Sequence, residues 1–70
     1  MSRFPAAKAR RVLAALLRIG WAVKRQSGSH KTLARHGSLI SSFAFQDDEE
    51  IGPVMLSRIA KRTGLKPGDI

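Results

Sequence analysis

Residues 20–45 read GWAVKRQSGSHKTLARHGSLISSFAF, and two turn signals divide this stretch into three segments of strand character. Ser27-Gly28 and His36-Gly37 are dipeptides typical of tight turns. The segments between them, residues 21–26, 30–35 and 38–45, are therefore predicted to run antiparallel. In the third segment Leu39, Phe43 and Phe45 share one face and Ser42 takes the other, which indicates a sheet with one buried side.

The sequence on either side of this stretch predicts two helices. Pro5 fits a helix start, an apolar stripe continues to residue 19, and Gly20 suits the left-handed position that ends a helix. A second helix is expected from Pro53 to about Thr63, and its apolar side consists of Met55, Leu56, Ile59, Ala60 and Thr63. We therefore expect a single α+β domain over residues 1–70, with the order α-β-β-β-α. It would have two layers, with a three-stranded antiparallel sheet and both helices on one face.

Strand alternation predicts which side chains face away from the helices. We expect Trp21, Val23, Leu33, Phe43 and Phe45 to point toward the helices. The outward set is Ala22, Lys24, Gln26, His30, Thr32, Ala34 and Ser42. His30 would then lie on the open face, with Lys24 and either Lys31 or Arg35 near it. A one-residue bulge would reverse the assignment.

The charge distribution indicates a polyanionic partner. The chain has 70 residues, a formal charge of +8 and no cysteine, and residues 1–46 contain nine Lys or Arg and no acid. Nucleic acid is favoured over anionic lipid because the cations are spread over several elements, although a solvated basic surface is the alternative. A chain this short excludes multidomain enzymes. The absence of cysteine excludes disulfides and thiolate zinc sites and fits a reducing, cytoplasmic location.

The N-terminal segment does not predict membrane targeting. It resembles a signal peptide only superficially, because Arg18 interrupts the apolar run. No segment has the length that a bilayer span requires, so no membrane partner is expected.

Gly28-Ser29-His30 is the local feature with catalytic potential. A histidine with an ordinary pKa of about 6.5 can serve as general acid or base at neutral pH. This chemistry fits the cleavage of RNA, which carries its own nucleophile, the 2′-hydroxyl. A ribonuclease that uses a histidine in this way needs no metal. The cations Lys24, Arg25 and Lys31 would stabilise the negative charge of the transition state. The alternative is an ordinary surface histidine. His36 is expected as a turn residue, and an acid/base pair of His30 and His36 would require the turn to bring the two together.

Two further groups have a functional and a structural interpretation. Asp47 to Glu50 could hold Mg²⁺, but consecutive acids point in different directions, so a solvated loop before a helix explains them better. Trp21, Phe43 and Phe45 could stack on bases, but they are expected to form the core of so small a domain.

The order of these motifs resembles the HicA-like toxins of bacterial toxin–antitoxin pairs. The residues that carry the resemblance run from about residue 8 almost to the end of the chain. They are Val12-Leu13 through Leu17, Gly20-Trp21, Arg25-Gln26, Gly28-Ser29-His30, Glu50-Ile51-Gly52-Pro53, Leu56, Ile59 and Thr63-Gly64-Leu65.

The resemblance implies a fold like a double-stranded-RNA-binding domain and an endoribonuclease that cleaves mRNA. His30 would be catalytic, with Gly28 and Ser29 shaping its surroundings, and no metal or small-molecule cofactor would take part. A HicB-type antitoxin would neutralise the toxin by covering the histidine. Two alternatives stay open: a non-catalytic basic RNA-binding module, and a protein whose basic face recognises an acidic protein.

Overall fold

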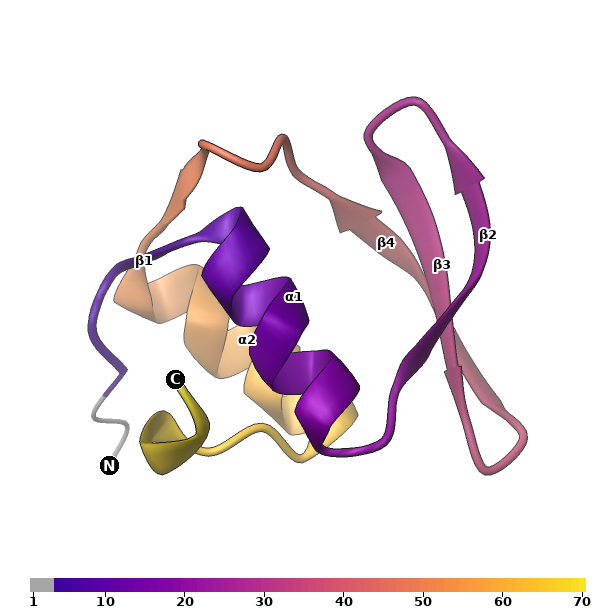
Figure 1. The fold of residues 1–70 in the computed structure, drawn as a ribbon. Coiled ribbons are helices and arrows are strands. Elements are labelled where there is room, and N and C mark those ends of the chain that lie inside the picture. Colours follow the sequence, from indigo (N-terminus) through magenta and orange to yellow (C-terminus); the bar gives the residue numbers. More distant parts are fainter. Residues whose placement is uncertain (1–3) are drawn as a thin grey trace.

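The computed structural model describes residues 4–70, apart from the side chains of residues 40–42. These residues form a small α+β domain with two α-helices and antiparallel sheets (Figure 1). The elements in chain order are β1 (Ala7–Lys8), α1 (Ala9–Arg18), β2 (Ala22–Ser27), β3 (His30–Arg35), β4 (Ser38–Ala44), β5 (Glu50–Ile51), α2 (Pro53–Thr63) and the 3₁₀ helix η1 (Pro67–Asp69).

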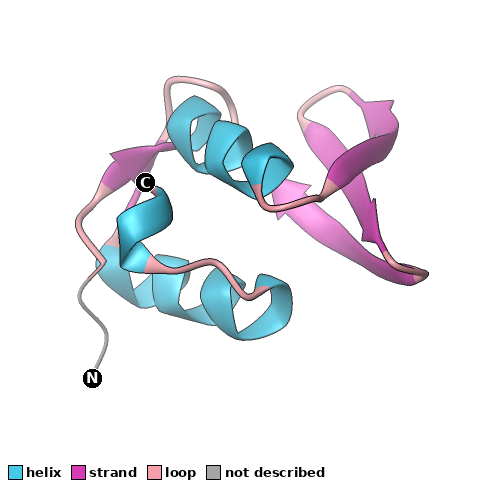
Figure 2. Ribbon diagram, turned by 60° about the horizontal axis from the view of Figure 1, so that its bottom comes forward, coloured by secondary structure: helices cyan, strands magenta, loops and turns pink. Residues whose placement is uncertain are grey.

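The predicted three-stranded antiparallel sheet is confirmed, with β3 between β2 and β4. Both helices lie on the same side of this sheet, as Figures 1 and 2 show from two directions. Neither helix, in the part of the chain that the structure describes, has the length and apolar character needed to cross a membrane.

Both predicted hairpin turns are present, and each has two residues. Ser27 pairs with His30, and Gly28 has a φ of 61°. Arg35 pairs with Ser38, and the intervening His36 and Gly37 have φ values of 51° and 81°. Two successive positive φ values are those of a type I′ turn, which matches the right-handed twist of the strands.

The core lies between the sheet and the helices. Leu33 of β3 is fully buried, as are Leu16 of α1 and Leu56 of α2. Trp21 and Phe43 are buried as predicted, whereas Phe45 is only partly buried. The Trp21 indole N–H donates a 3.0 Å hydrogen bond to the Thr63 carbonyl, and this bond links the start of β2 to the end of α2.

The first helix is shorter than predicted, because residues before it join a second sheet. Ala7 and Lys8 pair antiparallel with Ile51 and Glu50, and α1 begins only at Ala9. This pairing joins segments far apart in the sequence, and the pattern of residues 5–19 contains no signal for it. Gly20, with a φ of 106°, follows the helix as expected.

The acidic segment approaches the start of α1, which the sequence did not predict. The carbonyls of Glu49 and Asp47 accept hydrogen bonds from the backbone N–H groups of Ala9 (2.8 Å) and Arg10 (3.2 Å). These are donors that the first turn of a helix cannot satisfy internally. The Arg10 guanidinium also forms a 2.9 Å ion pair with Asp48. The acids are exposed, as the loop interpretation predicts.

A bulge in β2 corrects the predicted alternation of that strand. Val23 pairs with Leu33, but the next pair joins Arg25 to Thr32, so Lys24 is the extra residue. Directly paired residues lie on one face of a sheet. The pairing with Thr32 therefore places Arg25 on the outward face, which the sequence did not predict, while Lys24 has no residue of its own opposite it in β3.

The same bulge moves the rest of β2. Gln26, predicted to face outward, pairs with Lys31, and Ser27 pairs with His30. Ser27 therefore takes the outward place that was predicted for Gln26.

A second bulge, in β4, makes the predicted grouping of Leu39 with Phe43 wrong. Lys31 pairs with Phe43 and Leu33 with Ile40, so residues 41 and 42 both lie opposite Thr32. Leu39 then pairs with Ala34 on the outward face, where it is 57% exposed. The predicted outward direction of Ser42 concerns a side chain outside the described ones.

Candidate RNA-cleavage face

His30 is exposed and is the first residue of β3, directly after the Gly28-Ser29 turn. Its neighbours across the sheet are Ser27 of β2 and Ala44 of β4. The turn is tied to β2 by a 3.3 Å hydrogen bond from the Gln26 amide to the Gly28 carbonyl. The imidazole therefore projects from the end of a hairpin whose backbone is fixed on both sides.

Among the described residues that pair across the three-stranded sheet, the outward face contains His30 and the exposed Arg25, and no acid. Its members, assigned from strand pairing, are Ala22, Arg25, Ser27, His30, Thr32, Ala34, Leu39 and Ala44. The side chains in the middle of this face are small or carry a hydroxyl, so an extended RNA strand could approach the backbone of the sheet. A general acid or base and a guanidinium on one accessible face suit a phosphodiester substrate.

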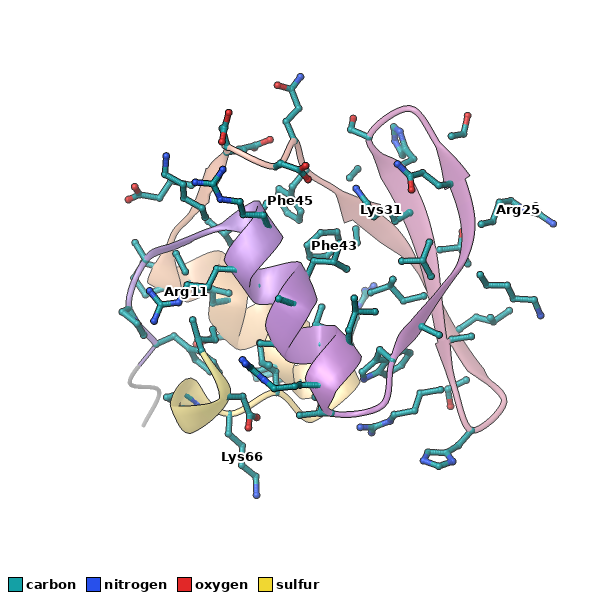
Figure 3. All side chains as sticks on the ribbon, in the orientation of Figure 1. Arg11, Arg25, Lys31, Phe43, Phe45 and Lys66 are labelled. Atoms are coloured by element: carbon teal, nitrogen blue, oxygen red, sulfur yellow. The ribbon has the colours of Figure 1, made fainter. Side chains whose placement is uncertain are left out.

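Lys31 lies on the opposite face from His30, contrary to the expectation that it lines the open face. It pairs with Phe43 and Gln26 and is 8% exposed. Figure 3 shows Lys31 and Arg25 directed to opposite sides of the hairpin. His30 and Lys31 are consecutive residues of β3, and alternation along a strand directs consecutive side chains to opposite faces.

Lys31 instead lines a depression between the hairpin and the acidic loop. This depression has a volume of about 350 Å³. Its lining residues are Gln26, Gly28, Ser29, Lys31, Phe45, Gln46, Asp47 and Asp48. The depression joins residues on either side of β4, and no local sequence pattern could have predicted it.

Arg35, the other cation expected near the open face, has a structural place. Its guanidinium lies 5.0 Å from the centre of the Trp21 ring and donates a 3.1 Å hydrogen bond to the Ile19 carbonyl. Its stem also lies 3.3 Å from where a Cβ on Gly20 would stand. Arg35 therefore stabilises the junction between α1 and β2.

The two histidines lie at opposite ends of β3. His30 begins the strand and His36 follows its last residue, Arg35. Six residues of strand extend about 20 Å, so the two imidazoles cannot act on one phosphate. His36 lies in its turn with a positive φ, which agrees with its predicted role as a turn residue.

Within residues 4–70, as far as their side chains are described, no three His, Cys, Asp or Glu side chains gather as a metal site. In the acidic loop, Asp48 is paired with Arg10.

The fold and this face define a small basic α+β domain with one accessible histidine on its sheet. The family model described as HicA toxin of bacterial toxin–antitoxin matches residues 9–65, which is most of the chain. This protein therefore belongs to the HicA toxin family. Neither the curated proteins nor the solved structures include a match to it.

Proposed function

We propose that this protein is a toxin that cleaves single-stranded mRNA without a metal, with His30 as the general acid or base. The observation that carries the proposal is the exposed position of His30 on an outward sheet face that has Arg25 and no acid. Membership of the HicA toxin family supports it, since toxins of this family are known for mRNA cleavage.

In the proposed reaction, a base removes the proton from a ribose 2′-hydroxyl, and the oxygen attacks the adjacent phosphorus. The P–O5′ bond breaks, the 5′-oxygen takes up a proton, and the products carry a 2′,3′-cyclic phosphate and a 5′-hydroxyl. His30 transfers one of these two protons. Arg25 stabilises the charge that develops on the phosphoryl oxygens.

The family resemblance adds three finer proposals. The fold is like that of a double-stranded-RNA-binding domain, the toxin acts in the cytoplasm, and a HicB-type antitoxin neutralises it by covering His30. The pairing of toxin and antitoxin in the family supports the last of these.

The test of the proposed function is cleavage of an unstructured RNA by the purified protein in EDTA. We expect cleavage to persist, and we expect a substrate with a single deoxyribose on the 5′ side of the scissile phosphate to resist it. The deoxyribose removes the nucleophile and leaves the phosphate unchanged. Cleavage lost in EDTA and restored by Mg²⁺ would contradict the metal-free mechanism. Binding without cleavage under all conditions would favour the alternative, a non-catalytic RNA-binding module.

The two faces of the hairpin predict different effects for two matched substitutions. Arg25→Met should weaken RNA binding and reduce the slope of log affinity against log salt by about 1, because one phosphate contact is lost. Lys31→Met keeps the buried stem and removes a charge on the other face, so RNA affinity should change little. Fluorescence anisotropy with labelled oligouridine at several salt concentrations measures both. Equal losses in the two variants would contradict the assignment of the RNA to the outward face alone.

A further inference from the structure

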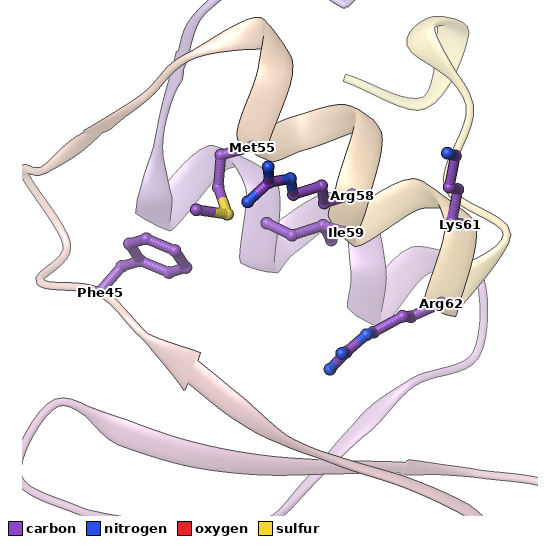
Figure 4. A pocket seen from close by; sticks show the side chains of 6 residues that line it. All are labelled: Phe45, Met55, Arg58, Ile59, Lys61 and Arg62. Carbon is purple, nitrogen blue, oxygen red and sulfur yellow. The ribbon is translucent and has the colours of Figure 1, made fainter.

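A second groove, about 480 Å³ in volume, lies between α2 and the chain just after β4. Figure 4 shows it from close by. The residues that line it are Phe45, Met55, Arg58, Ile59, Lys61 and Arg62. None of these is on the outward sheet face, so the groove is separate from the candidate cleavage face.

The floor of the groove is apolar. Phe45 and Ile59 are partly buried, and Met55 is 40% exposed although the helical pattern predicted it for the core side. The Phe45 ring packs edge-to-face on Phe43, with 5.2 Å between the ring centres, so its position is fixed. An aromatic ring that is held in place beside a flexible methionine suits an inserted apolar side chain.

The rim of the groove is cationic. Arg58, Lys61 and Arg62 follow one another at the three- and four-residue spacing that brings side chains together on a helix. In Figure 4 Arg58 extends along the helix toward Met55, Arg62 points toward the sheet, and Lys61 points away from it. Positive charge around an apolar floor is complementary to an acidic segment that carries apolar anchors.

We propose that this groove binds an acidic, amphipathic segment of a protein partner, and that this partner is the antitoxin. The inference rests on the proposed function for the identity of the partner. The segment would place an apolar side chain against Phe45 and Met55 and direct carboxylates to Arg58 and its neighbours. The antitoxin would then hold the toxin through this groove in addition to covering His30 on the sheet.

The observations favour protein over RNA in this groove. Phe45 is the single aromatic side chain among the lining residues, and its ring is packed on Phe43, so the groove lacks the series of rings on which successive bases stack. A strand that continued past Phe45 would enter the depression lined by Asp47 and Asp48, whose carboxylates repel phosphates. A protein segment with its own apolar anchor does not meet this obstacle.

The test uses a synthetic peptide of about 20 residues, long enough to populate a helix in water, with Leu and Phe on one face and Glu on the other. The control peptide has the same composition in scrambled order. Titration into the ¹⁵N-labelled full-length protein is followed by amide chemical shifts. We expect the amphipathic peptide to shift the amides of Phe45, Met55 and Ile59, and the scrambled peptide to bind more weakly.

A matched pair of charge reversals then tests the rim. Arg58→Glu should weaken peptide binding by at least about tenfold. Lys66→Glu makes the same change of charge outside the groove and should leave binding close to that of the wild type. Equal effects of the two reversals, or equal binding of the scrambled peptide, would overturn the proposal.

Oligouridine titrated in place of the peptide separates this inference from the proposed function. Shifts of the groove amides with oligouridine but not with the peptide would make the groove an RNA site and overturn the inference. A wild-type protein that binds the peptide in the groove but fails to cut RNA would instead overturn the proposed function alone.

Discussion

His30→Asn is expected to reduce the rate of RNA cleavage by about 10²–10⁴-fold, the usual contribution of a general acid or base. Asn cannot exchange a proton near neutral pH, whereas its size and polarity suit an exposed strand position. RNA affinity should therefore stay close to that of the wild type. The measurement is the initial rate on a fluorophore–quencher RNA, together with the affinity for a non-cleavable deoxy analogue.

His36→Asn is the matched control for this substitution. It removes the chain's other imidazole, and Asn tolerates the positive φ of that turn. We expect wild-type cleavage and a wild-type melting curve by circular dichroism. If the His36 variant loses activity while the His30 variant keeps it, the assignment of the acid or base to His30 is wrong. Equal activity in all three proteins would show that neither histidine takes part.

Leu33→Ala is expected to lower the free energy of unfolding by about 2–5 kcal/mol, the range for emptying a buried leucine site. Leu33 is 0% exposed in the central strand of the sheet and faces the helices. The total stability of a domain of this size is only about 4–10 kcal/mol. The substitution should therefore leave a large unfolded fraction at 37 °C, which urea denaturation followed by tryptophan fluorescence measures.

Leu39→Ala is the control, because it makes the same chemical change on the other face of the same sheet. Leu39 is 57% exposed, so the expected loss is within about 0.5 kcal/mol, as for other surface substitutions. The pair also tests the β4 bulge. Without the bulge Leu39 would share the buried face with Phe43. Leu39→Ala and Leu33→Ala would then lower the free energy of unfolding by similar amounts.

The sequence predicted the features of this fold that depend on neighbouring residues. The Gly28 and His36-Gly37 turns follow from residues that tolerate positive φ, and α2 follows from Pro53 at its start and Gly64 at its end. Gly64 has a φ of 79° and ends the helix as such a residue does. The burial of Trp21 and Phe43 follows from their size in a chain with few large apolar residues.

Features that depend on distant residues could not be predicted in this way. Each bulge adds one residue to a strand without any change in composition, and each reverses the face of the residues beyond it. The β2 bulge therefore brought Arg25 to the outward face and moved Gln26 away from it. The outward position of His30 was predicted correctly because β3 itself has no extra residue.

The candidate cleavage face was thus predicted in part, and the groove was not predicted at all. His30 and its turn come from one short motif, so the sequence was sufficient for them. The groove joins Phe45 to residues of α2, and its exposed Met55 belongs to an apolar helical stripe that resembles a core face. Only the three-dimensional arrangement shows that this part of the stripe is left uncovered by the sheet.

The contacts that close the start of α1 have a consequence for how the protein folds during synthesis. The Arg10–Asp48 pair joins residues 38 positions apart, and β1 requires β5 as its partner. Contacts so distant in sequence form late, because the intervening chain must first lose its freedom. The core also needs Leu56 of α2 and Leu65, so the nascent chain cannot complete it until these residues have left the ribosome. The start of α1 therefore acquires its closing contacts only when a much later part of the chain has been made.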